Sequence, residues 1–236
     1  MEKQIFRNDQ GLIFGLSKVS DGDMKLHKSD KHSEADINRL NLFLRLGIDP
    51  KKVVSVFSAH GTKITKADSR NQGCIVTNSD GLITNVSGTT LAISVADCAP
   101  LYLFDSRLRV IALLHCGWRG TAAKVVKLGI EKMADEYGSR SKDIQAFIGP
   151  RIRSCHFEVG PDVAAKFNPA DVGKRDNKYY VNLGGAIKRQ LLSAGLSAEN
   201  IKISEVCTYC GEEYFSHRRD KHSRVKAGLA YLGMEF

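Results

Sequence analysis

The segment VADCAPLYLFDSRLRVIALLHCGWRG, residues 95–120, says the most about the fold and about a candidate site. It contains two apolar runs, residues 101–104 and 110–114, which a short polar turn separates. Short runs rich in aromatic or β-branched residues and bounded by turn residues predict strands, and a tight connection favours an antiparallel hairpin. Pairing across the turn would place Cys98, before the first run, and His115, after the second, at the same end of a sheet.

Further strand-like runs lie in the middle of the chain, at residues 53–57, 82–86, 91–95 and 146–148. Helical patterns lie on either side of this region. This order predicts an α+β fold of mixed α/β layers, in which helices flank a central, largely antiparallel or mixed sheet. The chain shows neither an internal repeat nor a clear linker, so we expect a single metal-binding enzyme domain over residues 1–236.

Capping signals and apolar periodicity predict three helices. Ser33 and Asp36 form a capping box before apolar residues 37, 40, 43 and 44. Apolar residues 122, 126, 130, 133 and 137 mark one face of a second helix, and Asn182 caps a third. Each helix is followed by a glycine, and the three are expected within residues 33–47, 121–138 and 182–195.

The chain has 236 residues, of which 42% are hydrophobic and 26% charged, a composition typical of globular proteins. No signal peptide and no bilayer-length apolar run is visible, so we expect a cytoplasmic protein without membrane contact. Its six cysteines then indicate reduced thiols, metal ligands or catalysis rather than disulfides. The net charge of +9 suits a partner such as phosphate. The basic run 218–226 lacks the interleaved aromatic residues typical of single-stranded nucleic-acid binding.

A third candidate metal ligand joins Cys98 and His115. His60 follows the apolar run 53–57, so all three side chains lie at or just beyond the ends of predicted strands. Two imidazoles and one thiolate are a ligand type used for catalytic zinc, which keeps a fourth position open for water or substrate. The same ligands also suit Cu²⁺. Their spacing matches no standard zinc motif, so a Cys98–His115 nucleophile–base pair and a merely buried thiol remain alternatives.

Two other cysteine-containing segments carry weaker signals. Cys207 and Cys210 form a lone CxxC pair, and because a second pair is absent we predict that they are not metal ligands. Cys155 and His156 follow a Gly-Pro turn and are expected in an ordinary loop. Arg119, in the Gly-Trp-Arg-Gly segment before a predicted helix, is our candidate for binding an anion.

A set of motifs in this order resembles the YfiH family, whose members are described as peptidoglycan editing factors, laccase-like polyphenol oxidases and purine nucleoside phosphorylases. The motifs are HG at 60–61, ADCAPL at 96–101, HCGWRG at 115–120, IGP at 148–150 with CHFEV at 155–159, and CT at 207–208 with FSHRRD at 215–220. The resemblance runs from residue 53 or so to the C-terminus. It implies that His60, Cys98 and His115 are the metal ligands.

The chain departs from the family pattern at three places. Ser58 and Ala59 replace a usual Gln-Val before the HG motif, and Cys116 replaces a usual alanine. Near the N-terminus, Lys18 stands where an arginine is expected. This last change concerns the affinity for phosphate or substrate more than the affinity for metal.

The resemblance also implies roles for residues that act on the substrate. Asp80 stands where the family usually has an acidic residue before a strand, and we expect it to donate a proton to the departing base. It joins Cys98 and His115 in the expected catalytic set. Arg119 and Lys18 are the expected substrate-binding residues.

The resemblance implies a zinc-dependent enzyme of purine nucleosides, acting as a transferase and a hydrolase. Phosphorolysis would convert adenosine, inosine or methylthioadenosine into the free base and ribose 1-phosphate or its methylthio derivative. A metal with an open position can also activate water, which would deaminate adenosine to inosine. The expected partners are a purine nucleoside and phosphate, and the expected state is a monomer or a homodimer.

Three alternative functions stay open at this point. A copper-dependent, laccase-like polyphenol oxidase requires copper, and preferably more histidine ligands than one three-ligand set supplies. A cysteine hydrolase that edits peptidoglycan precursors would use Cys98 and His115 and would resist a chelator. A basic binding protein with a structural metal would turn over no nucleoside and would bind polyanions in a salt-sensitive way.

Overall fold

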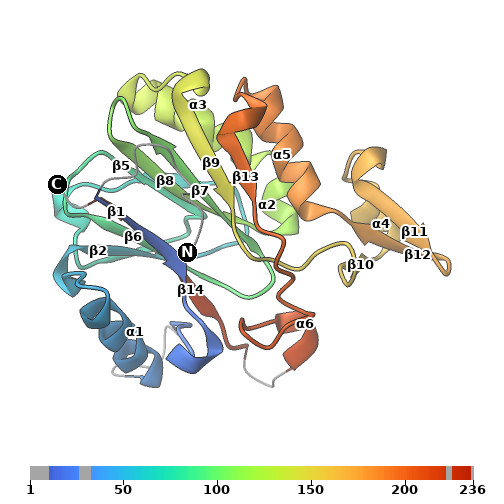
Figure 1. Ribbon diagram of the computed structural model, residues 1–236, viewed down its shortest axis with the longest axis horizontal. Coiled ribbons are helices and arrows are strands. Elements are labelled where there is room, and N and C mark those ends of the chain that lie inside the picture. The colour runs from blue at the N-terminus through green and yellow to red at the C-terminus, as the bar shows by residue number, and fades with distance from the viewer. Residues whose placement is uncertain (1–10, 27–32, 222–224, 235–236) are drawn as a thin grey trace.

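The computed structural model describes residues 11–26, 33–221 and 225–234. Two β-sheets lie face to face, and helices cover the outer face of each (Figure 1). The predicted α+β class, with mixed sheets and flanking helices, is confirmed. Its strands form two large sheets and a smaller third one instead of one central sheet.

The six-stranded sheet contains the hairpin predicted from residues 95–120. β7 (Ala99–Asp105) pairs antiparallel with β8 (Val110–Cys116), and Pro100 lies opposite His115. Cys98 and His115 therefore lie at the same end of this sheet, as predicted. Its strand order is β13 (Ile201–Ile203), β9 (Ile144–Ile148), β7, β8, β5 (Gly81–Thr84) and β3 (Ile64–Lys66), with the two outer pairs parallel.

The five-stranded sheet joins the two ends of the described chain. β1 (Leu12–Leu16) pairs antiparallel with β14 (Gly228–Met234), which continues to β6 (Thr90–Val95). β2 (Val53–Phe57) and β4 (Ile75–Thr77) complete the sheet as parallel neighbours. Sequence analysis missed β1, β4 and β14, because strands this short or this rich in glycine carry a weak periodic signal.

The alternation of side chains along β7 explains why the two sheets and the helices form layers. Leu101 and Leu103 pack in the cluster that includes the helices, while Tyr102 and Phe104 pack in the cluster between the sheets. Successive side chains of a strand point to opposite faces, so a strand that is apolar at every position is buried on both sides. The Tyr102 hydroxyl finds a partner by donating to the Gly15 carbonyl of β1 at 2.7 Å.

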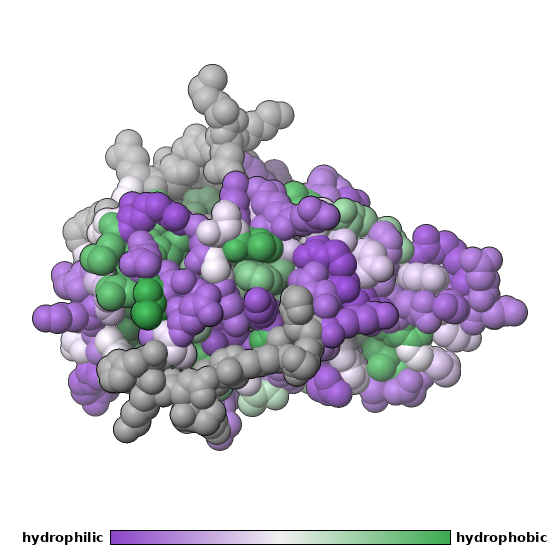
Figure 2. Space-filling view, turned by 90° about the horizontal axis from the view of Figure 1, so that it is seen from below, coloured by the Kyte–Doolittle hydropathy of each residue, from purple (hydrophilic) through white to green (hydrophobic). Residues whose placement is uncertain are grey.

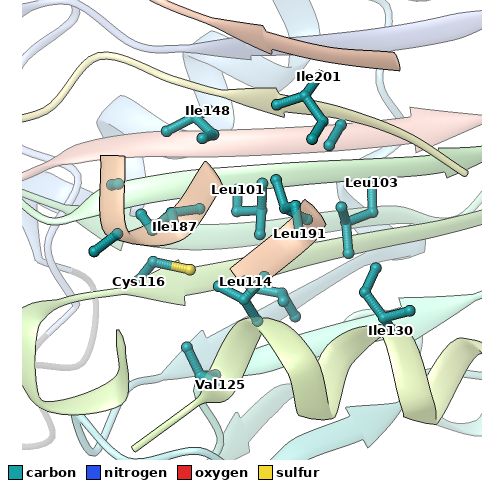
Figure 3. Packing of buried hydrophobic residues seen from close by; sticks show 14 of the residues in the cluster. Leu101, Leu103, Leu114, Cys116, Val125, Ile130, Ile148, Ile187, Leu191 and Ile201 are labelled. Carbon is teal, nitrogen blue, oxygen red and sulfur yellow. The ribbon is translucent and has the colours of Figure 1, made fainter. Parts of the chain in front are cut away.

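Two helices cover the outer face of the six-stranded sheet. α3 (Val125–Tyr137) and α5 (Leu183–Ser193) pack on β7 and β8, and Figure 3 shows their side chains meeting Leu101 and Leu114. The helix predicted from residue 121 is interrupted. A short helix, α2 (Trp118–Ala122), precedes α3, and Lys124 separates them with a left-handed backbone (φ 67°). The predicted cap of α5 is confirmed, since the Asn182 side chain accepts from the Gly185 N–H at 3.0 Å.

α1 (Glu34–Arg45) covers the five-stranded sheet and begins at the predicted capping box. The predicted apolar face is only partly the buried one, because Phe43 is buried while three other apolar side chains lie outside. Arg39 is buried, donating to the Ser55 hydroxyl at 2.6 Å and to the Met24 carbonyl at 3.0 Å, and this anchor fixes the rotation of the helix. Figure 2 shows hydrophobic surface on the α1 side, and the exposed residues are Ile37 (57%), Leu40 (45%) and Leu44 (61%).

A smaller three-stranded sheet extends from one end of the molecule (Figure 1). It consists of β10 (Glu158–Val159), β12 (Lys178–Val181) and β11 (Val172–Arg175), and α4 (Pro161–Ala164) lies beside it. α6 (His217–Asp220) precedes β14. Within the described residues, every helix is too short or too polar to cross a bilayer. Short 3-10 helices occur at Val19–Asp21, Pro50–Lys52, Ser69–Asn71, Ser141–Asp143, Pro169–Asp171 and Ala198–Asn200.

Candidate metal centre

The structure brings His60, Cys98 and His115 together. Cys98 immediately precedes β7, and His115 is the penultimate residue of β8, so the hairpin register places both at one sheet end. His60 arrives from the facing sheet, three residues beyond β2. One ligand atom from each side chain lies within 4.8 Å of the other two, and the two imidazole rings meet edge to face with centroids 4.9 Å apart. We call these three residues the inner cluster.

Hydrogen bonds fix the orientation of the His115 ring. Its Nδ1 lies 2.8 Å from the Ser58 hydroxyl and 3.2 Å from Asp80 Oδ1. Because Nδ1 is occupied, Nε2 is the nitrogen left to bind a metal. A histidine held by a carboxylate in this way is the usual arrangement at protein metal sites. Ser58, one of the departures from the family pattern, thus takes a direct part in the site.

Asp80 lies beneath the inner cluster as an acceptor of hydrogen bonds. Its residue is fully buried, and its two carboxylate oxygens accept from the backbone N–H groups of His60 at 2.8 Å and Gly61 at 2.7 Å. The Ser58 hydroxyl also donates to it. Burial alone would raise the pKa of Asp80, but the bonds from His115, Ser58 and Gly61 hold it well below its ordinary range. These contacts describe a fixed carboxylate and differ from those expected of a proton donor to a substrate.

The electrostatics of the inner cluster favour a positive charge. Burial opposes protonation of His115, yet the neighbouring Cys98 and Asp80 raise its pKa to about 9. Burial and the proximity of His115 lower the pKa of His60, so one positive charge is favoured and a second is not. Burial raises the pKa of the Cys116 thiol well above its usual value, so Cys116 behaves as a neutral core residue.

The lack of a side chain at Gly117 leaves room beside the three candidate ligands. A Cβ atom at this position would lie 3.0 Å from Cys98 Sγ, 3.6 Å from His115 Cε1 and 3.8 Å from His60 Cδ2. Any larger residue would press on the thiol. The backbone of His60 is also unusual, with φ 58°, a left-handed conformation that non-glycine residues seldom adopt. The donor set and the space around it therefore fit a metal ion.

The inner cluster lies in the wall of a cavity of about 700 Å³. This volume lies within the range of sites for small molecules and cofactors. Trp118 and Arg119 line one part of it, and the Arg119 guanidinium lies over the Trp118 ring, 4.3 Å from its centroid. Phe157, Glu158 and Arg218 line another part. The cavity thus combines aromatic surface, cationic groups and three metal-binding side chains.

The predicted substrate-binding residues differ in their placement. Arg119 lines the cavity as expected. Lys18 is not among the described residues that line it, and its Nζ pairs with Glu213 at 2.7 Å at an exposed position. Lys25 lines the cavity, and sequence analysis missed it together with Arg218. For Arg218 a signal was present, since it begins the basic run 218–226.

The prediction that Cys207 and Cys210 are not metal ligands rested on the absence of further ligands, and this premise does not hold. Cys155 and His156 lie beside them, and one ligand atom from each of the four residues lies within 4.8 Å of the others. The two pairs are about 50 residues apart along the chain, so their spacing in the sequence did not indicate that they meet. A parallel bridge between Arg151 and Cys207 brings the two loops together.

The sequence is similar to a protein family and to several bacterial and prokaryotic enzymes over most of its length. A family profile described as "Multi-copper polyphenol oxidoreductase laccase" matches residues 13–231. "Adenosine deaminase RL5" from an unknown prokaryotic organism is 30% identical over 247 residues, covering 98% of this chain and 93% of its own length. "Purine nucleoside phosphorylase YlmD" from Geobacillus stearothermophilus is 31% identical over 248 residues, covering 94% and 90%.

Solved structures share the fold. The crystal structure of YlmD from Geobacillus stearothermophilus superposes with a TM-score of 0.91 at 28% identity, covering 99% of this chain and 100% of that one. The Bacillus licheniformis hypothetical protein YfiH superposes with a TM-score of 0.90 at 24% identity, covering 97% and 94%. The matched profile extends through both sheets and the inner cluster. This chain therefore belongs to the YfiH family, the family described as multi-copper polyphenol oxidoreductase laccase.

Proposed function

We propose that this protein is a zinc-dependent enzyme of purine nucleosides, which cleaves adenosine, inosine and methylthioadenosine with phosphate and also deaminates adenosine. The observation that carries the proposal is the convergence of His60, Cys98 and His115 in the wall of a cavity of about 700 Å³. Relatives named purine nucleoside phosphorylase and adenosine deaminase, similar over nearly the whole chain, support a purine nucleoside-processing enzyme.

The inner cluster would hold the zinc ion through His60, Cys98 and His115, which leaves a position open to the cavity. When bound, the ion supplies Lewis-acid chemistry, polarising an oxygen atom of the substrate or of water. Asp80 and Ser58 hold His115 Nδ1, so that Nε2 keeps its direction toward the ligand position. We therefore assign Asp80 to positioning His115, in place of the proton transfer expected from the sequence.

The cavity walls supply the groups that the two substrates need. Arg119 presents a planar guanidinium that can bind phosphate through two parallel hydrogen bonds. Trp118 and Phe157 offer aromatic surface on which a purine ring can pack. In phosphorolysis an oxygen of hydrogen phosphate forms a bond to the anomeric carbon as the bond from that carbon to the purine nitrogen breaks, and the proton that the phosphate loses goes to the purine. In deamination water adds to the purine and ammonia leaves, so Arg119 is needed for the first reaction only.

A second candidate function, a cysteine hydrolase, rests on a specific observation. The Cys98 thiol contacts the His115 ring, and Asp80 is bonded to the ring nitrogen Nδ1. This is the order of a nucleophile, a general base and an orienting carboxylate. The presence of His60 as a third ligand favours the metal centre. A chelator distinguishes the two, because it abolishes only metal-dependent turnover.

The proposal is tested on protein purified without added metal. Zinc and copper are quantified per chain, and products from adenosine, inosine and methylthioadenosine are identified by mass spectrometry with and without phosphate. We expect zinc at the inner cluster, ribose 1-phosphate only when phosphate is present, and loss of both with His60→Ala. Copper together with oxidation of phenols, or turnover that survives complete metal removal, would contradict the proposal.

A further inference from the structure

A second group of metal-binding side chains lies outside the inner cluster. Cys155 and His156 belong to the loop after β9, and Cys207 and Cys210 to the loop after β13. All six cysteines of the chain are free thiols, so these sulfurs come together without a disulfide. We call the four residues the outer cluster. The function proposed above does not use them.

The spacing of the outer cluster matches a tetrahedral zinc site. Cys155 Sγ lies 3.5 Å from Cys207 Sγ and 3.7 Å from Cys210 Sγ. Zinc–sulfur bonds of about 2.3 Å in a tetrahedron place two sulfurs about 3.8 Å apart. Cys210 Sγ lies 3.2 Å from His156 Nδ1, where a tetrahedral site needs about 3.6 Å. These three distances differ by a few tenths of an ångström from those of a tetrahedral site, and all four ligand atoms lie within 4.8 Å of one another.

The loop of the CxxC pair has the local form of a metal-binding turn. The Arg153 N–H donates to Cys207 Sγ at 3.5 Å, and the Gly211 N–H donates to the Cys207 carbonyl at 3.4 Å. An N–H group directed at the sulfur favours the thiolate, which is the form that binds a cation.

The other ligands are also held in place. The His156 ring stacks on the Tyr209 ring with centroids 4.1 Å apart, which fixes the direction of Nδ1. Arg175 donates to the carbonyls of Ser154 and Cys155 at 3.0 Å each. The sulfur atoms of Cys207 and Cys210 lie 3.5 and 3.7 Å from Cys155 Sγ, close enough for one cation to bind all three.

We propose that the outer cluster is a second, structural zinc site, in which Cys155, His156, Cys207 and Cys210 bind one ion and join two loops. Four protein ligands close the coordination sphere, which is the property of structural sites, whereas catalytic sites keep a position open. Three soft thiolates and one imidazole select zinc over hard cations such as Mg²⁺.

The outer cluster also stands next to the cavity. Thr208, the neighbour of Cys207, donates to Asp97 Oδ1 at 2.6 Å, and the Arg218 N–H donates to Asp97 Oδ2 at 2.7 Å. Asp97 is the residue before Cys98, which belongs to the inner cluster. A zinc ion in the outer cluster would therefore fix the wall that carries Asp97 and Arg218, without contacting the substrate.

The test counts zinc ions in the full-length protein, purified under reducing conditions with zinc in the medium and then freed of loosely bound metal. Native mass spectrometry should find about two zinc ions per chain in the wild type, one at each cluster. Cys210→Ser and Cys155→Ala should each lose one ion and keep the other. Cys74→Ser, at an exposed cysteine outside both clusters, should keep both.

If Cys210→Ser and Cys155→Ala keep the inner ion, they still fold. His60→Ala should do the reverse, losing the inner ion and keeping the outer one. Replacement of zinc by Co²⁺ gives a second readout, since charge-transfer absorption from sulfur grows with the number of thiolates. We expect Cys210→Ser to remove more of this absorption than His60→Ala does. One zinc ion in the wild type that His60→Ala removes would overturn the proposal. So would a disulfide from Cys155 to Cys207 or Cys210 in place of the second ion.

Discussion

The inner and outer clusters use the same two residue types in different surroundings. The inner cluster has three candidate ligands, a buried carboxylate bonded to one of them and a cavity beside them. The outer cluster has four candidate ligands on two loops, with Cys155 and Cys210 exposed and a backbone N–H group directed at Cys207. The number of ligands decides whether a position stays open for chemistry. The comparison teaches that cysteine and histidine content alone does not identify a catalytic centre.

The largest expected effect comes from removing a ligand of the inner cluster. His60→Ala should lower phosphorolysis and deamination by about 10³-fold or more, because the Lewis acid that both reactions share is lost. Zinc content, measured by native mass spectrometry, should fall by one ion, and the outer cluster should keep its own. Loss of both ions would show that the two clusters are not independent and would break the comparison.

The carboxylate behind the inner cluster should have the next largest effect. Asp80→Asn keeps the shape but removes the charge that orients His115, and zinc affinity should fall about 10- to 100-fold. Competition with a chelator of known affinity measures this change. Asp162→Asn, at an exposed aspartate on α4, is the matched control. An unchanged zinc affinity in Asp80→Asn would show that the charge of Asp80 does not contribute to metal binding.

Glycines near the two clusters should respond differently to the same substitution. Gly117→Ala places a Cβ 3.0 Å from Cys98 Sγ, and overpacking of about 1–3 kcal/mol should weaken inner zinc by roughly 10-fold. Gly211→Ala meets nothing within 4 Å, so zinc at the outer cluster should be unaffected. Isothermal titration of each metal-free protein with zinc compares the two. Equal effects would mean that space around the thiols does not distinguish the clusters.

The smallest expected effect separates the two reactions of the inner cluster. Arg119→Lys loses the planar fork that binds phosphate, worth about 1 kcal/mol or roughly 5-fold in kcat/KM for phosphate. Deamination of adenosine needs no phosphate and should change less, and both zinc ions should remain. Steady-state assays at varied phosphate measure the split. An equal loss in both reactions would assign Arg119 to the structure of the turn that it shares with Trp118.

The sequence alone was enough to place Cys98 and His115, the two residues of the inner cluster that belong to one hairpin. Two apolar runs and a tight turn predict the β7–β8 hairpin, and its register places Cys98 and His115 at one end because strand pairing follows from local pattern and turn length. His60 was a third candidate because it follows the predicted strand at 53–57, and the resemblance to the family then implied that all three residues are metal ligands. Helix caps were equally predictable, since Ser33 and Asn182 act on groups within three residues of themselves.

Tertiary structure decided what depends on contacts between distant segments. His60 comes from the facing sheet, and the outer cluster joins two loops more than 50 residues apart, with a separation of 52 from Cys155 to Cys207. Asp80 reaches His115 because β5 pairs with β8. The rotation of α1 likewise depends on Arg39 reaching Ser55 in another element. Periodicity in the sequence shows which side of a strand or helix is apolar. Which residues become neighbours depends on how the sheets and loops pack, and a metal-ligand set or a charged pair forms only between such neighbours.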